Sequence, residues 1–365
     1  MSPHRREIRS AYIQWVKLGS EARYNLLASS VLAYPLDDLH VRIEELSISG
    51  PDGYGYPPLL ERLAMKAGVF QNQVVHAQGA SMANHLAMAA LLESDDEVLI
   101  EEPGYEPIIA TADYLGARIR RFPRRLEAGF QVDPRDIERS ISPRTRLIIL
   151  TNLHNPSGAR TPDATLRIVG EIARSVGAHV LVDEVYLEAC FDSPWQSACH
   201  LGPNFVVTSS LTKAYGLGGL RCGWVLAAPA LAERMRRLND LFGVTPAHPA
   251  DLLSVVALDH LQQIVARAQK LLDTNRALLK RFLDSRRDLL TIWPEAGTVV
   301  FPQLTNGRAG ALCHLLMEKY DTSVAPGDFF DAKEHFRIGI GGDTEMVREG
   351  LSRLGAALDE FARKC

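Results

Sequence analysis

The sequence predicts an α/β fold, in which a large domain with a mostly parallel sheet flanked by helices is joined to a smaller α+β domain. Two observations lead to this expectation. Between about residues 74 and 228, short apolar runs alternate with helical patterns, as they do in parallel sheets covered by helices. After Pro249 the pattern of apolar residues changes: over a long stretch they lie three and four positions apart, as in helices.

Seven short runs, mostly rich in Val, Ile or Leu, are predicted as the strands of the large sheet. They are Val74–Ala77, Glu97–Glu101, Ala117–Phe122, Arg146–Leu150, His179–Val182, Phe205–Thr208 and Gly223–Ala227. Helices are expected between them, notably Ser81–Leu92 and Asp163–Val176. One strand is expected to run antiparallel to the rest.

The C-terminal part of the chain is expected to form the smaller α+β domain. The periodic stretch after Pro249 predicts one or two helices between the domains, and Thr298–Pro302 and His335–Ile340 are short strand candidates. An amphipathic pattern predicts a final helix over Thr344–Arg363.

This change in the pattern of apolar residues also predicts where the domains divide. We assign residues 36–261 to the large domain, and residues 1–35 together with 262–365 to the small one. The division rests on this change alone, because the sequence has no repeat or flexible linker.

Composition excludes several classes of function. Hydrophobic residues make up 46% of the chain and charged residues 23%, which is typical of a soluble globular protein. The net charge of −4 comes from 40 basic and 44 acidic residues without a long block of one sign, which argues against a nucleic-acid partner. No run reaches the roughly 18 apolar residues that cross a bilayer, so no membrane role is expected.

The cysteines and histidines indicate neither a disulfide framework nor a metal site. The odd number and wide spacing of the five cysteines, without a CxxC pair or a secretory signal, favour reduced thiols in the cytoplasm. They are Cys190, Cys199, Cys222, Cys313 and Cys365. The eleven histidines are scattered, without metal-ligand spacing.

The most informative stretch is the glycine-rich loop over residues 209–224, which lies between two predicted strands. Open α/β sheets bind their ligands at strand ends of this kind. A partly desolvated lysine, here Lys213, can lose its proton and form a Schiff base with an aldehyde. Ser210 and Arg221 bracket Lys213 with a hydroxyl and a positive charge, which suit a phosphate dianion. A surface lysine beside a flexible turn is the alternative.

This loop resembles the Schiff-base motif of the class I/II aminotransferases, which are fold-type I enzymes dependent on pyridoxal 5'-phosphate. Asn155–Gly158 (Asn-Pro-Ser-Gly) resembles the Asn-Pro-Thr-Gly turn of that family, and Asp183–Tyr186 (Asp-Glu-Val-Tyr) resembles its Asp-Glu-x-Tyr strand end. Three such motifs in the family order are a specific signal. The resemblance spans about residues 20–345 and is strongest over 150–224. It implies that Lys213 carries the cofactor.

The two tetrapeptides contain three further candidate site residues. Asp183 ends an apolar run, so its carboxylate is expected at the rim of a central strand, where it could pair with a protonated ring nitrogen and sustain an electron sink. Tyr186 and Asn155 match the family residues that hydrogen-bond the phenolic oxygen of the cofactor. The structural alternatives are an aspartate that caps a turn, a core tyrosine and a turn asparagine.

The phosphate is expected at the start of the helix that contains Ala80 and Ser81, because free N–H groups and the helix dipole favour an anion there. Both residues match family positions, although a plain serine N-cap is the alternative. Tyr105 matches the aromatic residue that stacks on the cofactor ring, and packing in the core is its alternative.

Arg337 lies in a stretch (His-Phe-Arg-Ile-Gly) that resembles the strand which presents an arginine to the substrate carboxylate. A guanidinium grips a carboxylate through two parallel hydrogen bonds, whereas an arginine in an apolar strand otherwise needs a salt-bridge partner. Asn155 is assigned to substrate binding as well. The segment Tyr24–Ser30 resembles the loop that folds over the substrate.

The sequence departs from the family pattern near residue 54. The family supplies a tyrosine to the phosphate site of the neighbouring subunit, and the resemblance thus implies a homodimer. Here the segment is compressed, so that either Tyr54 or Tyr56 could supply the hydroxyl; we assign Tyr54. Leu60 replaces the arginine usual in the following helix, which makes the register uncertain there.

The resemblance implies transfer of the amino group of an α-amino acid to a 2-oxo acid. Lys213 would then move the proton between the substrate and the cofactor as general acid and base, with Asp183 and Tyr186 completing the catalytic group. A carbon–sulfur lyase or a decarboxylase on the same scaffold is the alternative, and a non-catalytic cofactor-binding regulator is a third. The substrate side chain is not readable from the sequence, because specificity depends on a few loop contacts.

Overall fold

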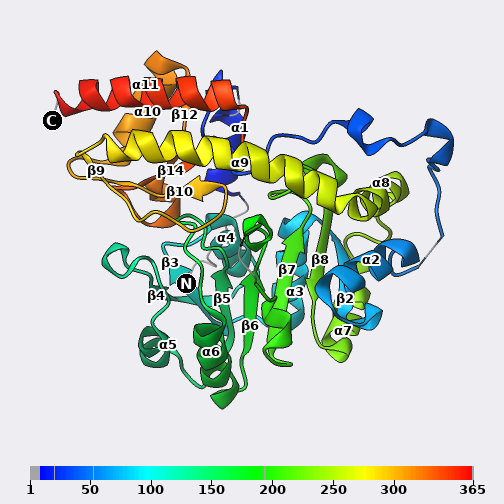
Figure 1. Cartoon of the computed structure of the whole chain (residues 1–365). Coiled ribbons are helices and arrows are strands. Elements are labelled where there is room, and N and C mark those ends of the chain that lie inside the picture. Colours follow the sequence, from blue (N-terminus) through cyan, green and yellow to red (C-terminus); the bar gives the residue numbers. More distant parts are fainter. Residues whose placement is uncertain (1–8, 20, 52, 193–194, 364–365) are drawn as a thin grey trace.

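Seven strands form one sheet in the order β2-β8-β7-β6-β5-β3-β4 (Figure 1). The computed structural model describes residues 9–19, 21–51, 53–192 and 195–363. The strands are β2 (Val74–Gln78), β3 (Glu97–Glu102), β4 (Arg118–Pro123), β5 (Thr145–Thr151), β6 (His179–Asp183), β7 (Phe205–Ser210) and β8 (Cys222–Leu226). Strand β8 pairs antiparallel with both neighbours, and the other pairs are parallel. The seven predicted strands and the single reversed strand are confirmed.

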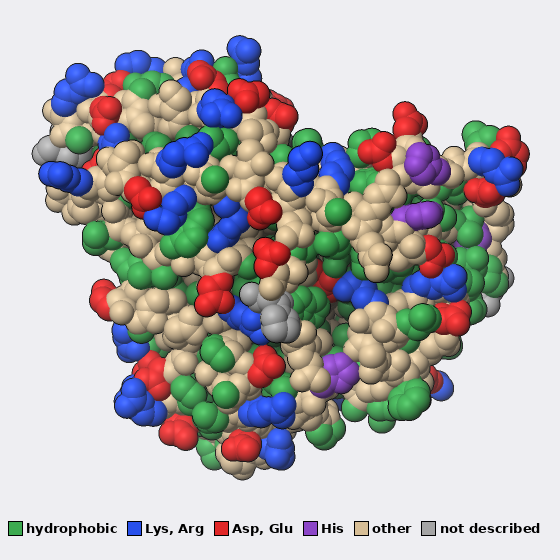
Figure 2. All heavy atoms as spheres, viewed as in Figure 1, with side chains coloured by type: hydrophobic (Ala, Val, Ile, Leu, Met, Phe, Trp, Pro, Cys, Tyr) green, Lys and Arg blue, Asp and Glu red, His purple; other side chains and the backbone are tan. Residues whose placement is uncertain are grey.

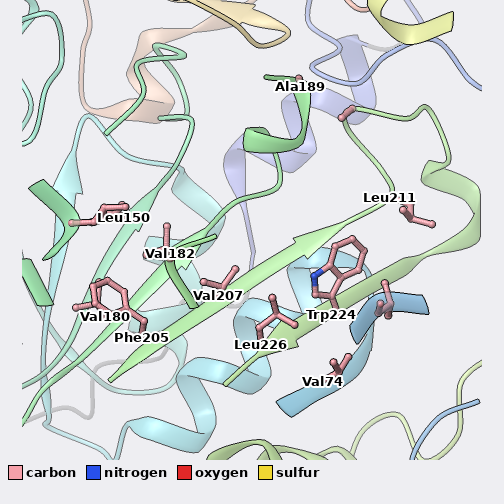
Figure 3. Close-up of a cluster of buried hydrophobic side chains, with 14 of the residues drawn as sticks. Val74, Leu150, Val180, Val182, Ala189, Phe205, Val207, Leu211, Trp224 and Leu226 are labelled. Carbon is pink, nitrogen blue, oxygen red and sulfur yellow. The ribbon is translucent and has the colours of Figure 1, made fainter. Parts of the chain in front are cut away.

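Helices cover both faces of this sheet, which explains why its strands read as nearly continuous apolar runs. They are α2 (Pro57–Ala67), α3 (Gly79–Leu91), α4 (Glu106–Tyr114), α5 (Pro134–Ser140), α6 (Asp163–Ser175), α7 (Pro229–Asn239) and α8 (His248–Asp259). In β6, Val180 and Val182 pack in a core with residues of α2, α5, α6 and α8. Leu181 instead faces a core built with α3, α4 and α7. Figure 3 shows part of the first core.

The smaller lobe lies beyond one edge of the sheet and combines both ends of the chain (Figure 1). Its strands are β1 (Tyr24–Asn25), β9 (Leu289–Leu290), β10 (Val299–Val300), β11 (Gln303–Leu304), β12 (Thr322–Ser323), β13 (Ala325–Pro326) and β14 (Phe336–Gly339). Strand β1 pairs with β12, and β14 lies between β10 and β13. Its helices are α1 (Ala11–Gly19), α10 (Ala309–Tyr320) and α11 (Thr344–Ala362). An α+β lobe is therefore confirmed.

The long helix α9 (Leu261–Asp284) joins the two parts. Its Ile264 packs in the core of the large sheet, whereas Ala268 and Leu272 pack in the core of the small lobe. Because one helix contributes to both cores, the boundary drawn between residues 261 and 262 stays a prediction.

Several elements differ from the sequence expectations, and two of them show why. The strand expected over Thr298–Pro302 is reduced to β10, whose two residues pair with Ile338 and Gly339. Helix α1 was not predicted, because it has nine residues, of which only Tyr12 and Gly19 are buried. A segment with so few buried positions leaves little periodic signal.

The surface matches the balanced composition. Figure 2 shows acidic and basic side chains interspersed over the face in view. Within the described ranges, no helix is both long and apolar enough to cross a membrane. Four cysteines are free thiols in the structure, and Cys365 lies outside the described residues.

The N-terminal segment packs so closely on β14 that Gly339 leaves no space for a side chain. A Cβ at Gly339 would lie 1.9 Å from the carbonyl oxygen of Ala28. We expect Gly339→Ala to lower the free energy of unfolding by about 1–3 kcal/mol, the usual cost of overpacking. Urea unfolding followed by circular dichroism measures this change. Gly219→Ala is the control, because no atom lies within 4 Å of its Cβ position. Equal losses in the two variants would contradict the packing argument.

Candidate active site

A cavity of about 380 Å³ lies at the carboxyl ends of the central strands. This is where open α/β sheets bind ligands. Its lining includes nearly all of the predicted site residues: Ala80, Ser81, Tyr105, Asn155, Asp183, Tyr186, Ser210, Lys213 and Arg221. Arg337 and Tyr54 are the predicted residues that do not line it. The tertiary structure therefore brings together residues that are up to 141 positions apart in the sequence, from Ala80 to Arg221.

Lys213 lies in the loop between β7 and β8, and its Nζ donates a hydrogen bond to Ser29 Oγ at 3.0 Å. Burial lowers the pKa of Lys213; Arg337 and Arg221 lower it further, against the opposing charge of Asp183. A lowered pKa increases the fraction of uncharged amine, which is the nucleophilic form.

Asp183 ends β6 as a buried carboxylate. Its oxygens accept hydrogen bonds from Asn84 Nδ2 at 2.7 Å and from the backbone N–H of Val185 at 3.0 Å. The amide oxygen of Asn84 in turn accepts the Thr208 hydroxyl at 2.6 Å, which fixes the orientation of the amide. Burial raises the pKa of Asp183, whereas these hydrogen bonds and the charge of Lys213 lower it.

The N-terminus of α3 forms one end of the cavity with Ala80 and Ser81 in its first turn. The first N–H groups of a helix have no partner within the helix. Gly79, with φ of +77°, allows Arg221 to approach, since a Cβ there would lie 2.2 Å from Arg221 Nη2. Ser210 adds a buried hydroxyl. Together these groups provide the donors and positive charge that a phosphate dianion requires.

Arg337 is fully buried in β14 behind this cavity. Its Nη1 donates to Asn155 Oδ1 at 2.8 Å, and its Nη2 donates to the Tyr12 hydroxyl at 2.7 Å. Its Nε finds no hydrogen-bond partner in the described part of the chain. No ion pair joins Arg337 to a carboxylate there, so a structural salt bridge does not explain the arginine. A buried charge of this kind favours an anionic ligand.

Two tyrosines complete the lining. Tyr105 directly precedes α4, and its ring packs edge-on against Tyr12 with centroids 5.5 Å apart. The Tyr186 ring centroid lies 5.9 Å from Lys213 Nζ. Burial raises the pKa of both tyrosines, so both stay protonated donors near neutral pH.

Several lining or contacting residues were not identified from the sequence. Helix α1 contributes Ile13 and Lys17 to the lining and Tyr12 to the contact with Arg337. Ser29 belongs to the predicted N-terminal loop, but its contact with the lysine was not assigned. Asn84 left only a weak signal, because it stands next to His85 in a helical run that is mostly apolar.

Tyr54 lies away from the cavity of its own chain. It is exposed, and its hydroxyl donates to Asp240 Oδ2 at 3.1 Å. Tyr56 precedes α2 and packs against His248 with ring centroids 4.9 Å apart. The assignment of Tyr54 to a neighbouring subunit stays a prediction.

No group of three or more His, Cys, Asp or Glu side chains is placed to hold a metal ion within the residues that the structure describes. The groups around the cavity instead suit an organic cofactor with a phosphate and an aldehyde. The helix N-terminus and Arg221 match the phosphate, Lys213 matches the aldehyde, and Asp183 offers a buried carboxylate in the same cavity. The residues present therefore fit pyridoxal 5'-phosphate.

Comparison with known proteins agrees with this fit. Residues 45–354 match the sequence profile of the family described as Aminotransferase class I and II. The arginine–pyruvate transaminase of Pseudomonas aeruginosa is 30% identical over 314 residues, which are 83% of this chain and 79% of that protein. The capreomycidine synthase of Streptomyces vinaceus is 29% identical over 294 residues, or 80% and 75% of the two chains. A PLP-dependent aminotransferase from Streptococcus suis has a TM-score of 0.90 at 25% identity and covers 97% of this chain and 98% of its own.

Glu184 follows Asp183 but does not line this cavity. It is buried, and its Oε1 accepts the backbone N–H of Ala198 at 2.7 Å. Burial, reinforced by the negative charges of Glu188 and Asp183, raises the pKa of Glu184 from 4.5 to about 8. The folded protein therefore retains a proton that the unfolded chain releases.

This difference predicts that stability falls as the pH rises. Between the unfolded pKa of 4.5 and the folded pKa of about 8, the native state binds more protons. The contribution of Glu184 to the free energy of unfolding should then decrease by up to about 1.4 kcal/mol per pH unit. Urea unfolding of wild type and Glu184→Gln from pH 5 to 8 measures it, and the variant should lack this slope. Glu233→Gln, at an exposed carboxylate, should keep the wild-type slope. Parallel profiles for wild type and Glu184→Gln would contradict the assignment.

Proposed function

Because the chain belongs to the class I and II aminotransferase family, we propose that Lys213, Asp183 and Arg337 are the residues with which it transfers the amino group of an α-amino acid to a 2-oxo acid. One observation carries this proposal. A lysine with a lowered pKa and a buried carboxylate line one cavity, and a buried guanidinium without a carboxylate partner in the described chain contacts Asn155, which lines the same cavity. The first two groups suit the cofactor, and the third suits the substrate.

We propose that the chain holds pyridoxal 5'-phosphate with nine residues. Backbone N–H groups of Ala80 and Ser81, with Ser210 and Arg221, would bind the phosphate. When bound, the cofactor supplies an aldehyde and an electron-withdrawing pyridinium ring. Asp183 would keep the ring nitrogen protonated. The remaining residues are Tyr105 against the ring face, Asn155 and Tyr186 at the phenolic oxygen, and Lys213 at the aldehyde.

Lys213 would act as general base and general acid on the substrate α-proton. Burial lowers its pKa, which increases the fraction of uncharged amine. The Ser29 hydroxyl, 3.0 Å from Nζ, would hold the amine in place. Asp183 would serve the same step at a distance, since its charge stabilises the positive ring that draws electrons from the α-carbon.

Arg337 would hold the substrate carboxylate, with Asn155 beside it. Nη1 already contacts Asn155, and Nε offers a donor with no partner in the described chain. Anchoring the carboxylate at the guanidinium leaves the α-proton as the group presented to Lys213. This arrangement favours transamination over loss of carbon dioxide.

We also propose that the enzyme is a homodimer and that it works in the cytoplasm. Exposed apolar side chains on segments 41–50 and 241–246 support an interface, because large apolar patches usually mark contact sites. Ile43, Ile48 and Val244 are exposed by 79%, 90% and 68%. Tyr54 lies in the same region, where it could reach the phosphate site of a second subunit.

Transamination predicts a stoichiometric half-reaction. Enzyme mixed with its preferred amino acid and no oxo acid should release one 2-oxo acid per active site and then stop. A 2-oxo acid added afterwards should restore the ability to react again. Lys213→Ala should release none, because the proton cannot be moved. Continuous release of ammonia or a thiol without an acceptor would replace this proposal with the lyase alternative.

The role of Arg337 predicts the effect of a charge-conserving change. Arg337→Lys keeps the positive charge but loses the planar fork that binds a carboxylate through two hydrogen bonds. Binding of both amino and oxo acids should weaken by about 1–3 kcal/mol, as for a charge-assisted hydrogen bond. Titration calorimetry with a substrate and its oxo acid measures it. Arg237→Lys, at an exposed ion pair, is the control. Unchanged affinity for both ligands would refute the assignment.

A further inference from the structure

Glu101 and Arg124 form a buried ion pair at the carboxyl ends of two neighbouring strands. Glu101 lies in β3, and Arg124 directly follows β4. Arg124 Nη1 lies 2.7 Å from Glu101 Oε2, and the two residues are only 2% and 1% exposed. Neither of them lines the candidate active site. A buried ion pair is often no more stabilising than apolar side chains of similar volume, so stability alone does not account for this one.

The carboxylate of Glu101 holds Thr151, which ends β5 and lines the cavity of the candidate active site. Its Oε1 accepts the backbone N–H of Thr151 at 2.7 Å and the Thr151 hydroxyl at 2.6 Å. Because the hydroxyl proton is directed at Glu101, the hydroxyl oxygen can accept the backbone N–H of Asn155, at 2.8 Å. Asn155 Oδ1 accepts a hydrogen bond from Arg337 Nη1. A continuous series of contacts therefore connects Arg124 with Arg337.

The contacts of Glu101 favour its ionised form. Thr151 donates two hydrogen bonds to Oε1, and the guanidinium of Arg124 donates one to Oε2. Burial raises the pKa of Glu101, whereas the charge of Arg124 and the hydrogen bonds from Thr151 lower it. The ring of His154, with Nε2 4.0 Å from Oε2, is engaged with the carbonyl oxygen of Pro103. Burial lowers the pKa of His154, so Arg124 supplies the counter-charge.

We propose that Glu101 and Arg124 are positioning residues, which fix Asn155 through the hydroxyl of Thr151. The inference rests on the proposed function, in which Asn155 contacts the phenolic oxygen of the cofactor. Because Oδ1 of Asn155 is bound to Arg337, its Nδ2 is the group that donates to this oxygen. The buried ion pair thus sets one residue that serves both the cofactor and the substrate carboxylate.

The test is a pH titration of the absorbance of the bound cofactor, without any substrate. A hydrogen bond donated to the phenolic oxygen stabilises the deprotonated cofactor, so weakening this bond raises the midpoint pH. Glu101→Gln keeps the shape of the side chain but turns an amide N–H2 group toward the donors of either Thr151 or Arg124. We expect the midpoint to rise by about 0.5–1 pH unit, the scale of one hydrogen bond.

A second change shows whether Glu101 acts through Asn155. Asn155→Ala should itself raise the midpoint, and Glu101→Gln added to it should cause no further rise, because both changes remove the same hydrogen bond. Additive shifts would overturn the proposal. Thr151→Val removes the connecting hydroxyl and should raise the midpoint, whereas Thr151→Ser keeps the hydroxyl and should retain the wild-type midpoint. Thr151→Val decides the question if Glu101→Gln does not fold.

Glu97 provides a matched control at the opposite end of the same strand. It is also buried, and it accepts the hydroxyl of Thr145, its neighbour in β5, at 2.5 Å. Glu97→Gln should lower stability in urea but leave the midpoint unchanged. A shift of equal size in Glu97→Gln, or wild-type midpoints in folded Glu101→Gln and Thr151→Val, would contradict the proposal. Since the titration requires bound cofactor but no turnover, its failure is distinguishable from failure of the half-reaction.

Discussion

Burial of the central sheet on both faces is the constraint on which the rest of the structure depends. Strands covered by helices on each side must be apolar along their length, so polar side chains can emerge only at the strand ends. Asp183 ends β6 in this way, and Ser210 ends β7. The same rule places Glu184 and Ser209 on the opposite side, where they line a second cavity.

Burying the charged groups around the first cavity costs free energy, and their hydrogen bonds and pKa shifts reduce this cost. Asp183 is buried but receives two hydrogen bonds, one of them from an amide that Thr208 orients. Burial lowers the pKa of Lys213, which favours its uncharged form. Arg337 keeps its charge, with hydrogen bonds only to neutral oxygens. A fold selected for stability alone would favour apolar residues at such positions, so a ligand is the physical reason for them.

The N-terminal segment connects the small lobe to Lys213. It pairs with β12 through β1, packs closely on Gly339, and then presents Ser29 to Lys213. Helix α1 adds Tyr12 above Arg337. Movement of the small lobe would therefore change the surroundings of both Lys213 and Arg337.

The sequence by itself determined the strands of the large sheet, because most of them are short apolar runs, and only the edge strand β4 carries several exposed positions. It also singled out Lys213, Asp183 and Arg337 as candidates, because their neighbours form recognisable motifs. Only the tertiary structure decided the contacts of Asn84, Ser29 and Tyr12, which meet their partners across 99, 184 and 325 residues. No local periodicity or turn signal records such contacts, because each depends on how separate elements pack against one another. For the same reason, Glu184 reads in the sequence as part of one motif, and only the folded sheet turns it away from that site.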